Sequence, residues 1–148
     1  MIVLDINRRL NPENRESHLN FPFSVDKIAK ALIINFSFYP DLMEDQEKAV
    51  QMVKDGFMKY YGEVDEDKIN NYLPIKNLLT LSIDSPKKSL GTAHRHLKIQ
   101  QHKITSEKAS RGFIPSEIMA GQWNITISVH SIATDYVDIK LSAEVLYD

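Results

Sequence analysis

Cysteine is absent from this 148-residue sequence. Its absence excludes a disulfide framework, a zinc site built on thiolates and a cysteine nucleophile. It also fits a protein of a reducing compartment.

Long hydrophobic runs are absent too. No stretch reaches the roughly 20 apolar residues that a transmembrane helix needs. The first residues, "MIVLDINRRLNPENRESHLN", lack both the apolar run and the small-residue cleavage site of a signal peptide. Charge of one sign is scarce as well, because 18 Lys and Arg face 20 Asp and Glu, for a net charge of −2. We therefore expect a cytoplasmic protein with neither a membrane nor a nucleic acid as its partner.

Glycine is scarce, with five residues in the chain. There is no Gly-rich phosphate loop and no G-x-S-x-G nucleophile elbow. Hydrophobic residues make up 43% and charged residues 26%, which is ordinary for a globular protein. The length predicts a single domain, residues 1–148, with enough core to fold without disulfides or metals. We expect no cofactor.

Alternating hydrophobicity is the main structural signal. In residues 28–39 four apolar side chains share one face, and similar alternation fills residues 77–84, 123–131 and 136–147. Residues 2–6 predict a short further strand, whereas residues 7–20 are polar and predict a loop. Alternation of apolar and polar residues, with one face of the strand exposed to solvent, is typical of antiparallel sheets. The sequence thus predicts a mostly β protein, an antiparallel, jelly-roll-like sandwich.

One segment has helical periodicity instead. From Leu42 to Tyr61 the apolar residues are spaced by threes and fours. Acidic residues crowd the start of this segment, where a helix dipole favours negative charge, and Gly62 follows as a cap. We predict an amphipathic helix over about residues 42–61 that packs its apolar face on the sandwich.

The segment "SLGTAHRHLKIQQH" holds three of the five histidines. An H-x-H pair, His94 and His96, is a spacing that metal sites use, and His102 or His130 could complete such a site. A strand over residues 95–104 would point Leu97 and Ile99 inward and the histidine pair outward. No acidic residue lies near the pair, and the basic residues around it would repel a cation. We interpret the histidines as the polar face of a strand and keep a metal site at His94, His96 and His102 as the alternative.

Basic residues gather between Asp84 and Gly112, where seven Lys and Arg face two acids. Such a surface attracts an anionic ligand or an acidic partner, although a solvated strand face accounts for it equally well. Aromatic residues for base stacking are missing there. The candidate ligand-binding residues are Arg95, Lys98 and His130.

Several motifs together resemble a known family. They are "NLLTLSIDSP", "GTAHRH" and "ASRGFIPSEIMAGQWNITISVHSIATDYVDIKLSAEV". Their order and spacing resemble the β-sandwich module that precedes the PHP-type phosphoesterase domain in bacterial metallohydrolases of the CehA/McbA family. The shared features are a D-x-P turn, an A-H-R segment, a G-F-I-P turn, a small-Gly-x-Trp start of a strand, and a His before a loop that ends in Asp.

This chain departs from the family at its H-x-H. In the family the catalytic metals belong to the following domain, whose H-x-H is typically followed within a few residues by Ser-Asp-Gly. Here "LKIQQH" follows instead, so no catalytic residue is carried over. The resemblance implies a sandwich fold and an accessory role.

Two functional hypotheses result. The first is a non-catalytic binding or docking module for a small or carbohydrate-like ligand or for a separately encoded hydrolase. The alternative is a small metal-dependent hydrolase that uses the His94/His96 cluster. We also expect Trp123 to be buried between the two layers, and Phe113 and Ile114 to pin their loop onto the sandwich.

Overall fold

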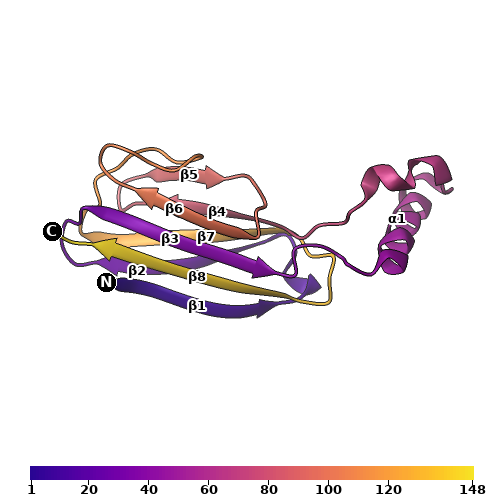
Figure 1. The fold of residues 1–148 in the computed structure, drawn as a ribbon, viewed down its shortest axis with the longest axis horizontal. Coiled ribbons are helices and arrows are strands. Elements are labelled where there is room, and N and C mark those ends of the chain that lie inside the picture. Colours follow the sequence, from indigo (N-terminus) through magenta and orange to yellow (C-terminus); the bar gives the residue numbers. More distant parts are fainter.

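A computed structural model describes residues 1–148 as two stacked four-stranded antiparallel sheets with a helical arm (Figure 1). Sheet A contains, in spatial order, β1 (Ile2–Leu10), β8 (Val137–Leu146), β3 (Ala31–Tyr39) and β6 (Ile99–Ile104). Sheet B contains β2 (Ser17–Val25), β7 (Gly121–Ser131), β4 (Leu78–Asp84) and β5 (Ser89–Ala93). The pairing is nested, since β1 pairs with β8, β2 with β7, β3 with β6 and β4 with β5. The predicted mostly β, antiparallel sandwich is confirmed.

The core lies between the sheets and contains 26 buried hydrophobic residues. Trp123 is fully buried there, as expected, and its ring stacks on Phe23 with 6.3 Å between centroids. Its indole Nε1 donates a 3.0 Å hydrogen bond to the carbonyl oxygen of Met119. A buried indole therefore has both an apolar neighbour and a partner for its one polar group.

The predicted loop over residues 7–20 is wrong. β1 continues to Leu10, a short 3₁₀ turn (η1) covers Pro12–Asn14, and β2 begins at Ser17. β8 holds the second half of β1 in the sheet, and Arg9 bonds both carboxylate oxygens of Asp138 at 2.7 and 2.9 Å. Polar side chains on a solvated strand face look like a loop when they are read from sequence alone.

The predicted strand over residues 95–104 is also wrong at its start and in its register. Residues 94–98 form a loop between the sheets, and β6 begins at Ile99. Leu97 and Ile99 are exposed by 53% and 75%, whereas Gln100 and His102 are buried. Pairing with β3 fixes this register, because Gln100 lies opposite Phe36, whose side chain is buried in the core.

The helical arm occupies residues 40–77, between β3 and β4, and projects from one end of the sandwich (Figure 1). Helix α1 (Gln46–Tyr61) begins after the N-cap Asp45 and ends at Gly62, whose φ is +74°. A second helix, the 3₁₀ helix η2 (Glu66–Tyr72), follows it. Neither helix is long and apolar enough to cross a membrane.

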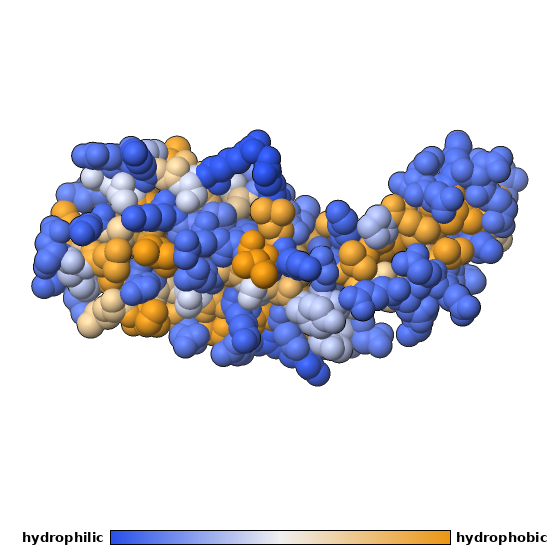
Figure 2. Space-filling view, in the orientation of Figure 1, coloured by the Kyte–Doolittle hydropathy of each residue, from blue (hydrophilic) through white to orange (hydrophobic).

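The predicted packing of the helix on the sandwich is wrong. Val53 and Phe57 of α1 join Ile69 of η2 in a small hydrophobic cluster separate from the main core. η2 folds back over the apolar stripe of α1 and so takes the place of the sheet. Part of this surface stays open, because Tyr60 and Tyr61 are exposed by 74% and 71%. Figure 2 shows hydrophobic surface on the arm between hydrophilic lobes.

Asn77 holds the base of the arm. Its side chain is buried, and its backbone N–H donates to the carbonyl oxygen of Asp41 at 2.9 Å. A second backbone bond, from Met43 N to Ile75 O at 2.9 Å, also joins the two chains of the base. The arm is thus attached by a short two-stranded stem.

Candidate functional site

A cavity of about 380 Å³ lies at the free edge of β6, beside the loop of residues 94–98. The end of β5, the start of β6 and the segment 110–112 close its walls. Its polar side chains come from β5, from β6 and from both loops: Thr92, His94, Arg95, Gln100, Gln101, His102, Ser110 and Arg111. It gathers the A-H-R segment and the start of the G-F-I-P turn in one place.

Two glycines bring the loops together. Gly91 has a φ of +122°, and a Cβ placed on it would lie 2.1 Å from the carbonyl oxygen of Gly112. Gly112 has a φ of +93°, and its own Cβ would lie 2.5 Å from the carbonyl oxygen of Thr92. Only glycine permits both the backbone conformation and this approach. The contact lets Thr92 N donate to Gly112 O at 3.1 Å, which fixes Arg111 beside the cavity.

A buried polar pair forms one wall of the cavity. The Gln100 amide donates to the carbonyl oxygen of Leu97 at 2.8 Å, which turns its own oxygen toward His102 Nε2, also at 2.8 Å. His102 Nε2 must therefore carry the proton in this bond. The ring edge contacts Phe113, with 5.0 Å between centroids. Burial lowers the pKa of His102 below its ordinary value, so the neutral imidazole is favoured.

The cavity is electrostatically positive. Arg95 and Arg111 both line it, and neither forms one of the protein's four ion pairs. No carboxylate lines the cavity. Guanidinium groups suit carboxylate and phosphate because their fixed fork of donors matches two oxygens at once.

The free edge of β6 provides main-chain hydrogen-bonding groups beside the cavity. Lys98 accepts a backbone bond from Phe38 of β3, so even-numbered residues of this segment face β3 and odd-numbered ones face the free edge. Lys103 uses its edge groups to bond Ser110, through Lys103 N to Ser110 Oγ at 2.8 Å and Ser110 N to Lys103 O at 3.0 Å. Gln101 faces the same edge beside the cavity, so its N–H is a further donor for a bound anion.

The predicted ligand-binding residues do not come together. Arg95 lines the cavity, and Lys98 lies in the same loop but does not line it. His130 lies on the outer face of sheet B, where Nε2 is 2.9 Å from Thr80 Oγ1. Gln100 and Arg111 complete the site with Arg95, and no sequence motif singles them out.

Of the three clustered histidines, His94 and His102 both line the cavity, and His96 does not. His94 lines the cavity, whereas His96 Nδ1 lies 3.0 Å from the carbonyl oxygen of Leu79, and its ring lies 6.0 Å from that of His130. His102 is buried against Gln100. The structure contains no group of three or more His, Cys, Asp or Glu residues placed to hold a metal ion. The expectation that Phe113 and Ile114 both pin their loop onto the sandwich holds in part, since Phe113 is buried whereas Ile114 is exposed by 45%.

Comparison with known proteins adds little. No protein-family model matches the sequence, and no curated protein matches it. A solved crystal structure of a protein from Sulfurospirillum deleyianum matches with a TM-score of 0.32 and 9% sequence identity, over 93% of this chain and 96% of that one.

Proposed function

We propose that this protein is a non-catalytic binding module whose ligand carries a carboxylate or phosphate group. The observation that supports this proposal is the pair of unpaired guanidinium groups, Arg95 and Arg111, in one cavity without a carboxylate. The ligand's anionic group lies between them, within reach of the Gln101 N–H.

Gln100 and His102 give the site a fixed, neutral wall. Both side chains are buried and bonded to each other, so they lose little further freedom when a ligand binds. An uncharged imidazole leaves the two arginines as the source of positive charge. Preorganisation of this kind favours binding of a small ligand.

The environment of Ser110 supports a binding role over catalysis. Its hydroxyl oxygen accepts from Lys103 N at 2.8 Å and donates to Lys103 O at 3.4 Å. A serine nucleophile needs a base within hydrogen-bond reach of its hydroxyl. Here the backbone of Lys103 in β6 forms both hydrogen bonds of the Ser110 hydroxyl.

The test is a titration of the purified protein with small carboxylates and phosphates, with citrate and inorganic phosphate as the first probes. We expect a saturable rise in melting temperature for the wild type. The double variant Arg95→Ala/Arg111→Ala should lose it, while Lys87→Ala/Lys88→Ala, which removes two exposed charges from the β4–β5 turn, should keep it. If both double variants lose the effect equally, the binding is nonspecific charge attraction and the proposal fails.

A further inference from the structure

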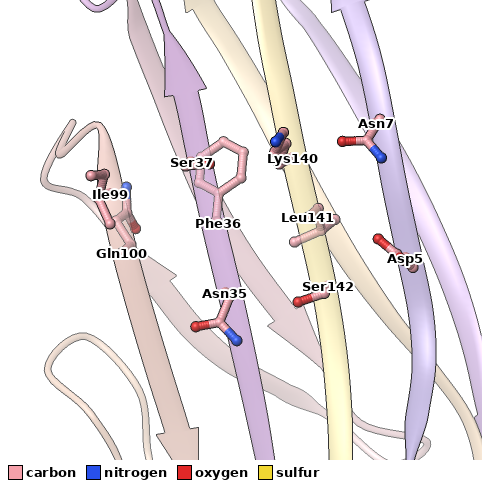
Figure 3. Close-up of a pocket in the computed structure, with 10 residues that line it drawn as sticks. All are labelled: Asp5, Asn7, Asn35, Phe36, Ser37, Ile99, Gln100, Lys140, Leu141 and Ser142. Carbon is pink, nitrogen blue, oxygen red and sulfur yellow. The ribbon is translucent and has the colours of Figure 1, made fainter.

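The outer face of sheet A carries two ordered rows of polar side chains (Figure 3). Register places Asp5 opposite Ser142, Ser142 opposite Asn35, and Asn35 opposite Gln101, so one row crosses all four strands. The second row runs in the same way through Asn7, Lys140, Ser37 and Ile99. Neighbouring strands lie about 4.8 Å apart, so each row spans about 14 Å.

These rows surround a hollow of about 390 Å³. Asp5 and Asn7 line it from β1, Lys140 and Ser142 from β8, and the side chains of β3 and β6 close the other side (Figure 3). The hollow is thus formed by residues of four strands rather than by loop residues.

Sheet B provides an internal comparison. Its outward side chains are bonded to one another in pairs and triplets. Ser82 bonds Thr92 at 2.8 Å, His18 bonds Ser128 at 2.8 Å, and Ser24 bonds Gln122 at 3.0 Å. Asn20 accepts from both Asn124 and Thr126.

The two rows of sheet A differ in this respect, although Arg9 and Asp138 of the same face are bonded to each other. One such bond lies within the first row, from Gln101 Nε2 to Asn35 Oδ1 at 2.9 Å. The other polar members of the rows bond no protein group: Asp5, Asn7, Ser37, Lys140 and Ser142. These five side chains keep their donors and acceptors for a ligand.

The charges of the hollow balance. Asp5 and Lys140 both line it, and they do not form an ion pair with each other. The remaining polar groups are amides and hydroxyls. This mixture of donors and acceptors without net charge matches a neutral molecule with many hydroxyl groups.

We propose that the outer face of sheet A is a second binding site, for a neutral saccharide. The amides of Asn7 and Asn35 bond vicinal hydroxyls, Asp5 accepts from a hydroxyl and Lys140 donates to one. Ile99, which is 75% exposed, supplies an apolar contact for the C–H face of a sugar ring. This site adjoins the cavity of Arg95 and Arg111 through Gln100 and Gln101, but it does not depend on the function proposed for that cavity.

The experiment is an NMR titration of the uniformly ¹⁵N-labelled protein with neutral trisaccharides: maltotriose, cellotriose, xylotriose and N,N′,N″-triacetylchitotriose. We expect at least one of them to shift backbone signals of β1, β3 and β8 in a saturable way. Asn35→Ala/Lys140→Ala should weaken this binding at least tenfold. A matched control, Ser24→Ala/Gln122→Ala, removes an exposed bonded pair from sheet B and should bind as the wild type does. The melting temperature of each variant is measured as well, so that a loss of binding is not confused with a loss of folding.

Three outcomes would overturn the proposal. The first is that no trisaccharide shifts the sheet A signals. The second is that the control weakens binding as much as the sheet A variant does. The third is that a saccharide binds only when it carries a phosphate or carboxylate and loses binding in Arg95→Ala/Arg111→Ala, which would assign it to the anion cavity and leave sheet A empty.

Discussion

The side-chain amide of Asn77 donates a 2.9 Å hydrogen bond to Oγ1 of Thr134, which joins the stem of the arm to the loop between β7 and β8. The same amide donates to the carbonyl oxygen of Pro40 at 2.8 Å, and its oxygen accepts from Ala133 N at 2.7 Å. One buried side chain therefore connects three segments that are distant in sequence.

Asn77→Ala should destabilise the protein by about 1–3 kcal/mol, because it leaves buried polar groups without partners. Asn71→Ala, at an exposed position of η2, should change stability by less than about 0.5 kcal/mol. Urea unfolding followed by circular dichroism measures both. An unchanged midpoint for Asn77→Ala would show that the stem is held by its backbone bonds alone.

Gly91→Ala and Gly56→Ala should have opposite effects. A Cβ at Gly91 meets the carbonyl oxygen of Gly112, and the φ of +122° strains any other residue, so this variant should unfold at lower urea. A Cβ at Gly56, inside α1, meets nothing within 4 Å. Alanine there should stabilise the helix by up to about 1 kcal/mol. Equal effects of the two substitutions would contradict the close packing of the two loops.

His102 should make stability depend on pH. The pKa of His102 is lowered in the folded protein. Below the unfolded value of about 6.5 the unfolded chain therefore binds more protons than the folded one, and stability decreases as the pH decreases. This contribution is fully present above that value. Urea midpoints from pH 7.5 to 5.0 for the wild type and for His102→Gln measure the difference. His102→Gln should lose less stability on acidification; parallel curves would show that other groups cause the dependence.

We expect no phosphoester hydrolysis by the purified protein supplied with zinc or manganese. A two-metal site needs several ligands around a shared centre about 4 Å across, whereas His94 and His96 lie in different surroundings. The assay uses generic phosphoester and carboxylester substrates with wild type and His94→Ala/His96→Ala. Metal-dependent turnover that the double variant loses would favour the hydrolase alternative.

Much of the sandwich was predictable from sequence, because β3, β7 and β8 each have one buried and one solvated face. The same alternation is present in β2, at Leu19, Phe21 and Phe23, but Pro22 and the polar residues before it obscure the pattern. Proline is tolerated there because β2 lies at the edge of sheet B.

The candidate cavity was less predictable. Gln100 and His102 are polar residues on the inward face of β6, so a rule that points apolar residues inward reverses the strand. Arg95 and Arg111 line one cavity because Gly91 and Gly112 approach each other, a contact that depends on tertiary structure. Local pattern carries no information about such a contact.

The nested strand pairing sets the order in which this chain can fold during synthesis. None of the first three strands pairs with another of the three: Asn7 lies opposite Lys140, Phe21 opposite Ile125 and Phe36 opposite Gln100. Only the β4–β5 hairpin can close from neighbouring residues. Neither sheet can be completed until the ribosome has released β7 and β8, so most of the sandwich forms only after these two strands have emerged, and it forms slowly because its contacts are distant in sequence.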